Sequence, residues 1–103
     1  MRRLRRTTIN KEEERKRFKA LYEGILTLRN KEECAAFLRD LCTMQELEDL
    51  AERFAIAKLL AKEVTYRGIS GDTGASTTTV SRVSHWYHHG TGGYRTVISR
   101  MHK

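Results

Sequence analysis

A run of short polar side chains lies between residues 76 and 85 of this chain. Hydroxyl, guanidinium and imidazole groups form hydrogen bonds with base edges and with phosphate oxygens, and they need no cofactor to do so. Because most of these side chains are small, a helix that carries them can approach the floor of a DNA major groove closely. The candidate DNA-binding residues of this segment are Ser76, Thr77, Thr78, Ser81, Arg82 and His85.

Two short helices joined by a tight turn are needed to position these groups. Thr65 is typical of an N-cap, and it begins a first helix that carries Ile69 on its apolar side. Gly74 can adopt the positive φ that a sharp turn requires. Ser76 caps a second helix, in which Val80 and Val83 share one face. Residues 65–86 therefore predict a helix-turn-helix, although this pattern alone also fits an ordinary helical hairpin.

Charge is distributed unevenly along the 103 residues, whose formal net charge is +7. Residues 1–19 carry nine Lys or Arg against three Glu, and residues 63–103 carry five against two acids. Residues 20–62 carry six basic against eight acidic side chains. The positive charge therefore lies near the predicted helix-turn-helix and in the N-terminal segment, which favours a nucleic acid over an acidic protein as the partner.

The length of the chain leaves room for one domain without a large core of its own. We expect a basic, flexible arm over residues 1–9 and a single helical domain over 10–103. The arm, with Arg2 to Arg6, is either a solubilising tail or a set of phosphate contacts. A small helical chain gains core by pairing with a copy of itself, so a homodimer is expected.

Apolar spacing predicts four further helices and an all-α fold of six helices, in a chain without proline. The first covers roughly Asn10 to Leu28. The second follows the cap Asn30 and is expected to bury Phe37, Leu38 and Leu41. The third starts at a capping box of Thr43 and Glu46. After the glycines at 90–93, the last helix places apolar residues at helical spacing: Tyr94, Val97, Ile98 and Met101.

An enzyme or a metal site would have to use the histidines of the segment HWYHH, which are His85, His88 and His89. No acidic or cysteine side chain stands at ligand spacing from them, so we expect no enzyme and no metal. Cys34 and Cys42 form no metal or disulfide pattern and are expected to be core thiols. Without a long apolar segment, no membrane partner is expected, and the predicted location is the cytoplasm.

From about Phe37 to Met101 the chain resembles the Trp repressor family, in particular its short YerC/YecD-type branch. Much of this resemblance lies in the segment TGASTTTVSRV, residues 73–83. The other matching positions are Thr43, Glu46, Leu50, Arg53, Leu59, Leu60, Thr65, Arg67 and Ile69. The resemblance implies an intertwined homodimer of six-helix chains, with two helix-turn-helix motifs that enter successive major grooves of a DNA operator. It also implies that Thr77, Thr78 and Ser81 approach bases and that Arg67 contacts DNA.

The resemblance also implies a candidate effector pocket that contains Thr43, Arg53 and Arg82. In the members that respond to L-tryptophan, the two arginines enclose the indole, and the second arginine is followed by glycine. Here the following residue is Val83, whose side chain takes up space that the ligand would need. The alternative role of Arg53 and Arg82 is ion pairing at the surface or between subunits, for instance with Glu46 or Glu52. No cofactor is therefore expected, with L-tryptophan or another small effector as the alternative.

Trp86 stands four residues after Arg82, one helical turn away. Its indole can either stack on the guanidinium of Arg82, in place of an effector, or pack against the rest of the fold. The sequence as a whole predicts a sequence-specific, DNA-binding transcriptional regulator, most simply a repressor. The alternative is a module of the same shape that binds a protein or RNA partner.

Overall fold

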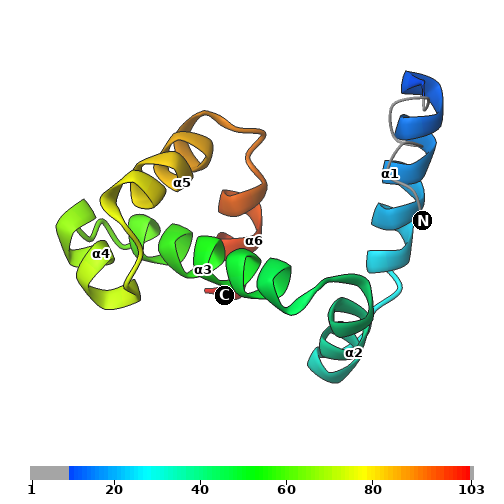
Figure 1. The fold of residues 1–103 in the computed structure, drawn as a ribbon, viewed down its shortest axis with the longest axis horizontal. Helices are drawn as coiled ribbons and strands as arrows, with labels where there is room; N and C mark the ends of the chain where they lie inside the picture. Colours follow the sequence, from blue (N-terminus) through cyan, green and yellow to red (C-terminus); the bar gives the residue numbers. More distant parts are fainter. Residues whose placement is uncertain (1–9, 103) are drawn as a thin grey trace. The chain divides into compact units, whose positions relative to one another are not determined.

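The computed structural model describes residues 10–102, and the predicted arm at 1–9 lies outside this part of the chain. The described residues form six helices and no strand, which confirms the predicted all-α fold (Figure 1). The helices are α1 (Lys11–Ile25), α2 (Lys31–Leu41), α3 (Met44–Ala61), α4 (Tyr66–Thr73), α5 (Thr77–His89) and α6 (Gly93–Met101). They group into two units, one that ends at Leu41 and one that begins at Cys42, which are described separately below.

The first unit contains α1 and α2, and neither helix buries a residue. Asn10 caps α1 and accepts a hydrogen bond from the Glu13 amide at 2.8 Å. The helix ends at Ile25, three residues before the predicted end. Asn30 caps α2, and the Glu33 carboxylate accepts from the Arg29 amide, one residue further out than in a standard capping box.

The apolar residues of this unit are more exposed than the sequence predicts. Phe37 and Leu38 are half-buried, and Leu41 is exposed, so the expectation that α2 buries all three is wrong for the single chain. In α1 the apolar stripe of Phe18, Leu21, Tyr22 and Ile25 is also exposed. Helical spacing identifies an apolar face, but it does not identify what covers that face.

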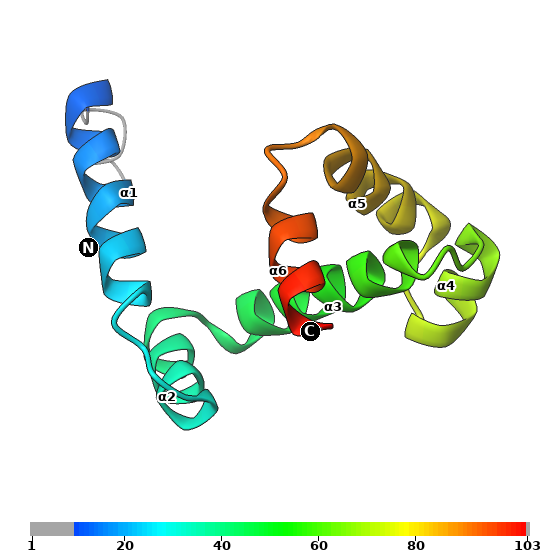
Figure 2. The same ribbon diagram turned by 180° about the vertical axis from the view of Figure 1, so that it is seen from behind.

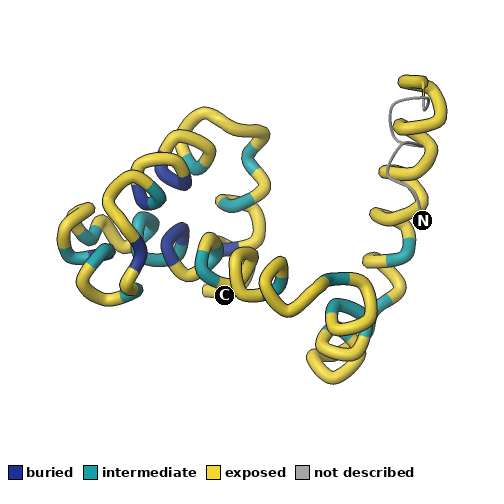
Figure 3. Tube along the Cα trace, viewed as in Figure 1, coloured by how far each residue is buried: buried dark blue, intermediate teal, exposed yellow. Residues whose placement is uncertain are grey.

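The second unit is built around α3, which packs against α4, α5 and α6, while α4 packs against α5 (Figures 1 and 2). The predicted capping box at the start of α3 is present: Thr43 Oγ1 accepts from the Glu46 amide, and a Glu46 carboxylate oxygen accepts from the Thr43 amide. Among the described residues, all those that are buried lie in this unit (Figure 3). The apolar core consists of Ile56, Ala57, Ile69, Ala75, Val80, Val83 and Ile98.

The connection between α4 and α5 is the tight turn that the sequence predicts. Gly74 ends α4 in the left-handed conformation, with φ 81°, and its amide donates to the Ser70 carbonyl. The Thr73 hydroxyl donates to the Ile69 carbonyl at 2.8 Å and accepts from the Ala75 amide at 3.1 Å. The Ser70 hydroxyl donates to the Ala75 carbonyl. These local hydrogen bonds set the direction in which α5 leaves the turn.

Replacing Gly74 by alanine tests the contribution of this turn. No atom lies within 4 Å of the position that a Cβ would occupy, so the cost comes from the left-handed backbone alone. We expect the free energy of unfolding to fall by about 1 kcal/mol, measured by urea denaturation at a fixed protein concentration.

Gly71→Ala is the matched control. Gly71 lies inside α4 and also has open space around it, so alanine there raises helix propensity without strain. We expect it to increase the free energy of unfolding by about 0.5 to 1 kcal/mol. A loss of similar size in both variants would contradict the role assigned to the φ of Gly74.

Candidate nucleic-acid interface

The helix-turn-helix is formed by α4 and α5 as predicted, although α5 continues to His89, three residues beyond the predicted end. Thr65 caps α4 by accepting from the Gly68 amide at 3.0 Å. Ser76 caps α5 by accepting from the Thr79 amide at 3.1 Å. His88 and His89 therefore belong to the last turn of α5, and the glycine-rich connection starts only after them.

One side of α5 is fixed in the core of the second unit. Val80 and Val83 are buried there as predicted, together with Ser84. Because α5 packs against both α3 and α4, these three residues determine which face of the helix points outward.

The outward face of α5 forms a hollow of about 560 Å³, lined by Tyr66, Thr77, Thr78, Ser81, Arg82 and His85. The structure thus brings together five of the predicted DNA-binding residues, and all five are exposed. Ser76 and Arg67 are exposed too, but neither lines the hollow. Ser76 is instead the N-cap of α5, and Arg67 lies in the first turn of α4.

Tyr66 is a residue of this hollow that the sequence analysis missed. It is the first residue of α4 and the hollow's one contribution from that helix. Its hydroxyl donates a hydrogen bond to Ser84 Oγ on α5. The Thr65 cap predicts that Tyr66 is the first residue of α4. The contact between Tyr66 and α5 cannot be predicted from the spacing of apolar residues.

A second, more polar cavity of about 330 Å³ lies against α3, α5 and α6. Arg53 and Arg82 both line it, as the effector hypothesis requires, but Thr43 does not. Thr43 is occupied as the N-cap of α3. The other residues that line this cavity are Asp49, Glu52, Thr79, Val83, Trp86 and Tyr94.

Within the described residues of the single chain these arginines do not form the suggested ion pairs, and pairing between subunits stays a prediction. Neither Arg53 nor Arg82 forms an ion pair with Glu46 or Glu52 within that part of the chain. Trp86 does not stack on Arg82, and its ring instead meets His85 edge to face at 5.0 Å between centroids. Arg82 lines both the hollow and the polar cavity, so one side chain borders two openings.

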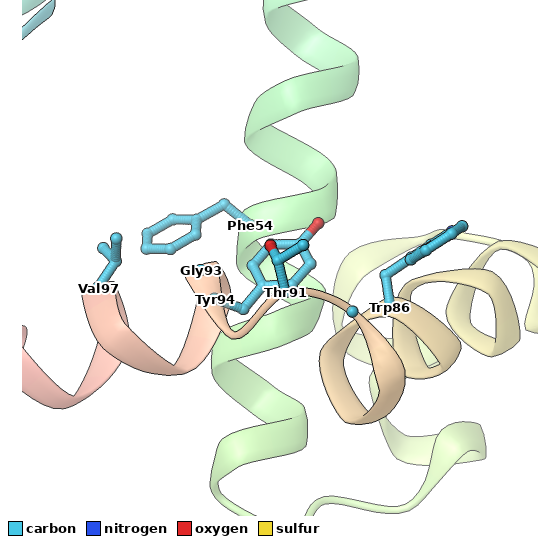
Figure 4. A pocket seen from close by; sticks show the side chains of 7 residues that line it. Phe54, Trp86, Thr91, Gly93, Tyr94 and Val97 are labelled. Carbon is cyan, nitrogen blue, oxygen red and sulfur yellow. The ribbon is translucent and has the colours of Figure 1, made fainter. Parts of the chain in front are cut away.

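An apolar cavity of about 580 Å³ opens between the same three helices. Phe54 from α3, Trp86 from α5, and Tyr94 and Val97 from α6 line it, together with the glycine-rich connection at Thr91 (Figure 4). Val97 and Met101 are exposed, so of the apolar residues predicted for α6 only Ile98 is buried and Tyr94 is half-buried.

The histidines near the end of α5 are engaged with neighbouring side chains. His88 Nδ1 lies 3.4 Å from an Arg95 guanidinium nitrogen, and Arg95 stacks on the ring of Tyr87.

Within residues 10–102 there is no group of three or more His, Cys, Asp or Glu side chains placed to hold a metal ion. Cys34 and Cys42 are free thiols, half-buried in the single chain. Among the described helices, none is long and apolar enough to cross a membrane.

Comparison with known proteins places this architecture in a family. The family model described as Trp repressor protein matches residues 16–102. The chain is 41% identical over 81 residues to the uncharacterised protein YerC of Bacillus subtilis (strain 168), which covers 79% of this chain and 78% of YerC.

Two crystal structures are similar in fold and sequence. A TrpR-like protein from Eubacterium eligens ATCC 27750 is 40% identical, with a TM-score of 0.76 over 81% of this chain and 86% of that one. A protein from Staphylococcus aureus is also 40% identical, with a TM-score of 0.78 over 82% of this chain and 85% of that one. With the family model covering most of its length, the chain belongs to the Trp repressor family, a family of DNA-binding regulators and not of enzymes.

Proposed function

We propose that the chain binds double-stranded DNA with sequence specificity and regulates transcription, most simply as a repressor that blocks a promoter. The observation that carries the proposal is the hollow on α5, where five side chains able to hydrogen-bond to base edges share one exposed face. The opposite face of α5 is held in the core, so the outward groups keep a fixed direction. A regulator of this kind acts beside the chromosome, which makes the cytoplasm its proposed location.

Basic side chains near the hollow support DNA as the partner. Arg82 borders the hollow, and Arg67 is exposed in the first turn of α4. Residues 63–103 contain five Lys or Arg against two acidic residues. Phosphate neutralisation by such groups supplies most of the sequence-independent part of DNA affinity.

A homodimer is part of the proposal. Helices α1 and α2 bury no residue, and four apolar side chains of α1 are exposed along one stripe. The apolar cavity of the second unit is likewise open. A second copy would cover apolar surface of this kind, and it would present two copies of α5 to a palindromic DNA site.

We propose further that DNA binding needs no small effector. Val83 is 3% exposed and belongs to the core, and it also borders the polar cavity between Arg53 and Arg82. An L-tryptophan side chain in this cavity would have to share space with that branched side chain.

Selection of binding sites from a random duplex library, with and without added L-tryptophan, tests the proposed function. We expect one palindromic sequence to be enriched equally in both arms, because the groups that line the hollow are already assembled. Enrichment only with L-tryptophan would contradict effector-independent binding. No enriched duplex at moderate salt would instead support the protein- or RNA-binding alternative.

Substitution of the two arginines tests how the selected duplex is held. Arg67→Ala and Arg82→Ala are each expected to weaken binding about tenfold or more and to reduce the salt dependence. In a dimer each substitution removes two contacts, so the slope of log K against log salt should become about 1.8 less steep where those contacts are to phosphates. Fluorescence anisotropy between 50 and 200 mM NaCl, as rough limits, gives both quantities.

Arg100→Ala is the control, since Arg100 is exposed on α6 outside the helix-turn-helix. Its affinity and salt slope should stay near those of the unaltered protein. Equal losses of DNA affinity in all three variants would mean that basic side chains contribute to binding whether or not they lie in the helix-turn-helix.

Leu21→Asp tests the proposed homodimer. A carboxylate in the exposed apolar stripe of α1 should oppose burial of that stripe against a second copy. We expect the dimer fraction to fall at least tenfold, roughly the effect of losing an apolar contact and burying a charge. Sedimentation velocity over a range of protein concentrations measures this fraction.

Ala20→Asp is the matched control in the same helix. Ala20 is exposed, and it lies about 160° around α1 from Phe18 and Tyr22, at 100° per residue. We expect this variant to dimerise like the unaltered protein. A monomer at every concentration for the unaltered chain would contradict the homodimer.

A further inference from the structure

We propose that Tyr66 determines specificity at one position of the DNA site, where its ring packs against the 5-methyl group of a thymine. This inference rests on the proposed function, since it names a base contact of the same surface. It concerns a residue of α4, whereas the candidate base contacts derived from the sequence all lie on α5.

The placement of Tyr66 suits a base contact. It lines the hollow together with Thr77, Thr78, Ser81 and two further residues of α5, and it is 45% exposed. It thus belongs to α4 but borders the surface that α5 presents.

A hydrogen bond holds the ring in this position. The Tyr66 hydroxyl donates to Ser84 Oγ, and Ser84 is 3% exposed. Among the described residues, no buried side-chain nitrogen or oxygen is left without a hydrogen-bond partner. The hydroxyl hydrogen of Tyr66 is used inside the protein, so toward a ligand Tyr66 offers its ring carbons and an oxygen that can only accept.

The chemistry of the hollow identifies the base. The residues from α5 supply hydroxyl, guanidinium and imidazole groups, so Tyr66 supplies the one aromatic carbocycle of the lining. In the major groove the distinctive apolar feature is the 5-methyl group of thymine, which apolar side-chain atoms contact. The Tyr66 ring adds apolar carbon atoms to this lining, and such atoms match the 5-methyl group, which only thymine carries among the four bases.

Replacement of each thymine of the selected duplex by deoxyuridine, which removes only the methyl group, tests the inference. We expect one position per half-site at which the unaltered protein loses about fourfold in affinity, the effect of one buried methyl group. The same replacement should cost nothing in Tyr66→Ala, whereas Tyr66→Phe, which keeps the ring but lacks the hydrogen bond to Ser84, should retain part of the loss. Anisotropy titrations measure the affinities, and circular dichroism checks that each variant is folded.

A second measurement uses the unaltered protein, so it does not depend on whether a variant folds. 5-Iododeoxyuridine at the same position keeps a substituent close in size to methyl and forms a photochemical cross-link to a side chain in contact. Mass spectrometry should find the cross-link on Tyr66.

The outcomes separate this inference from the function on which it rests. A specific duplex whose deoxyuridine losses are the same in Tyr66→Ala and in the unaltered protein would overturn the role of Tyr66 and leave DNA recognition standing. Cross-links confined to other residues would do the same. If no duplex is selected from the library, both the role of Tyr66 and specific DNA recognition would be overturned.

Discussion

The packing of α5 against α3 and α4 is the constraint on which the candidate interface depends. Val80 and Val83 enter a core with Ile56 and Ile69, and this burial fixes the rotation of α5 about its own axis. A helix turned by a single residue would move its outward groups by about 100° and place other side chains in the hollow. The core is small, so the orientation of the polar face depends on few apolar contacts.

The turn before α5 complements this packing. A left-handed glycine and the hydroxyl groups of Ser70 and Thr73 satisfy the backbone groups between α4 and α5. The chain can therefore change direction sharply within the three residues between the helices and still bury Ala75 at the junction. Local hydrogen bonds fix the angle, and apolar packing fixes the rotation.

The local features of this fold could be predicted from the sequence, because their determinants lie within a few residues. The caps Thr65 and Ser76, the capping box at Thr43 and the left-handed Gly74 are examples, and all are present. Features that depend on distant segments could not be predicted in the same way. The hydrogen bond from Tyr66 to Ser84 joins residues 18 apart, and the exposure of the α1 stripe depends on which surface covers it.

The candidate site shows the same division. Five residues of the hollow follow from the outward face of one helix, whose inward face the valines identify. The sequence identifies the arginines and Val83 of the polar cavity, but not the walls that α3 and α6 add through Asp49 and Tyr94. The organisation of residues 10–103 as one domain and the role of the N-terminal arm stay predictions.

Arg82 borders both the hollow and the polar cavity, and this shared position has a thermodynamic consequence. A group that enters the cavity and binds this guanidinium more strongly in one of its orientations shifts the population of orientations available to DNA. The resulting coupling free energy is reciprocal, so a duplex that engages Arg82 alters the affinity of the cavity for that group by the same factor. A single arginine would in this way couple the two openings if a ligand occupied the cavity.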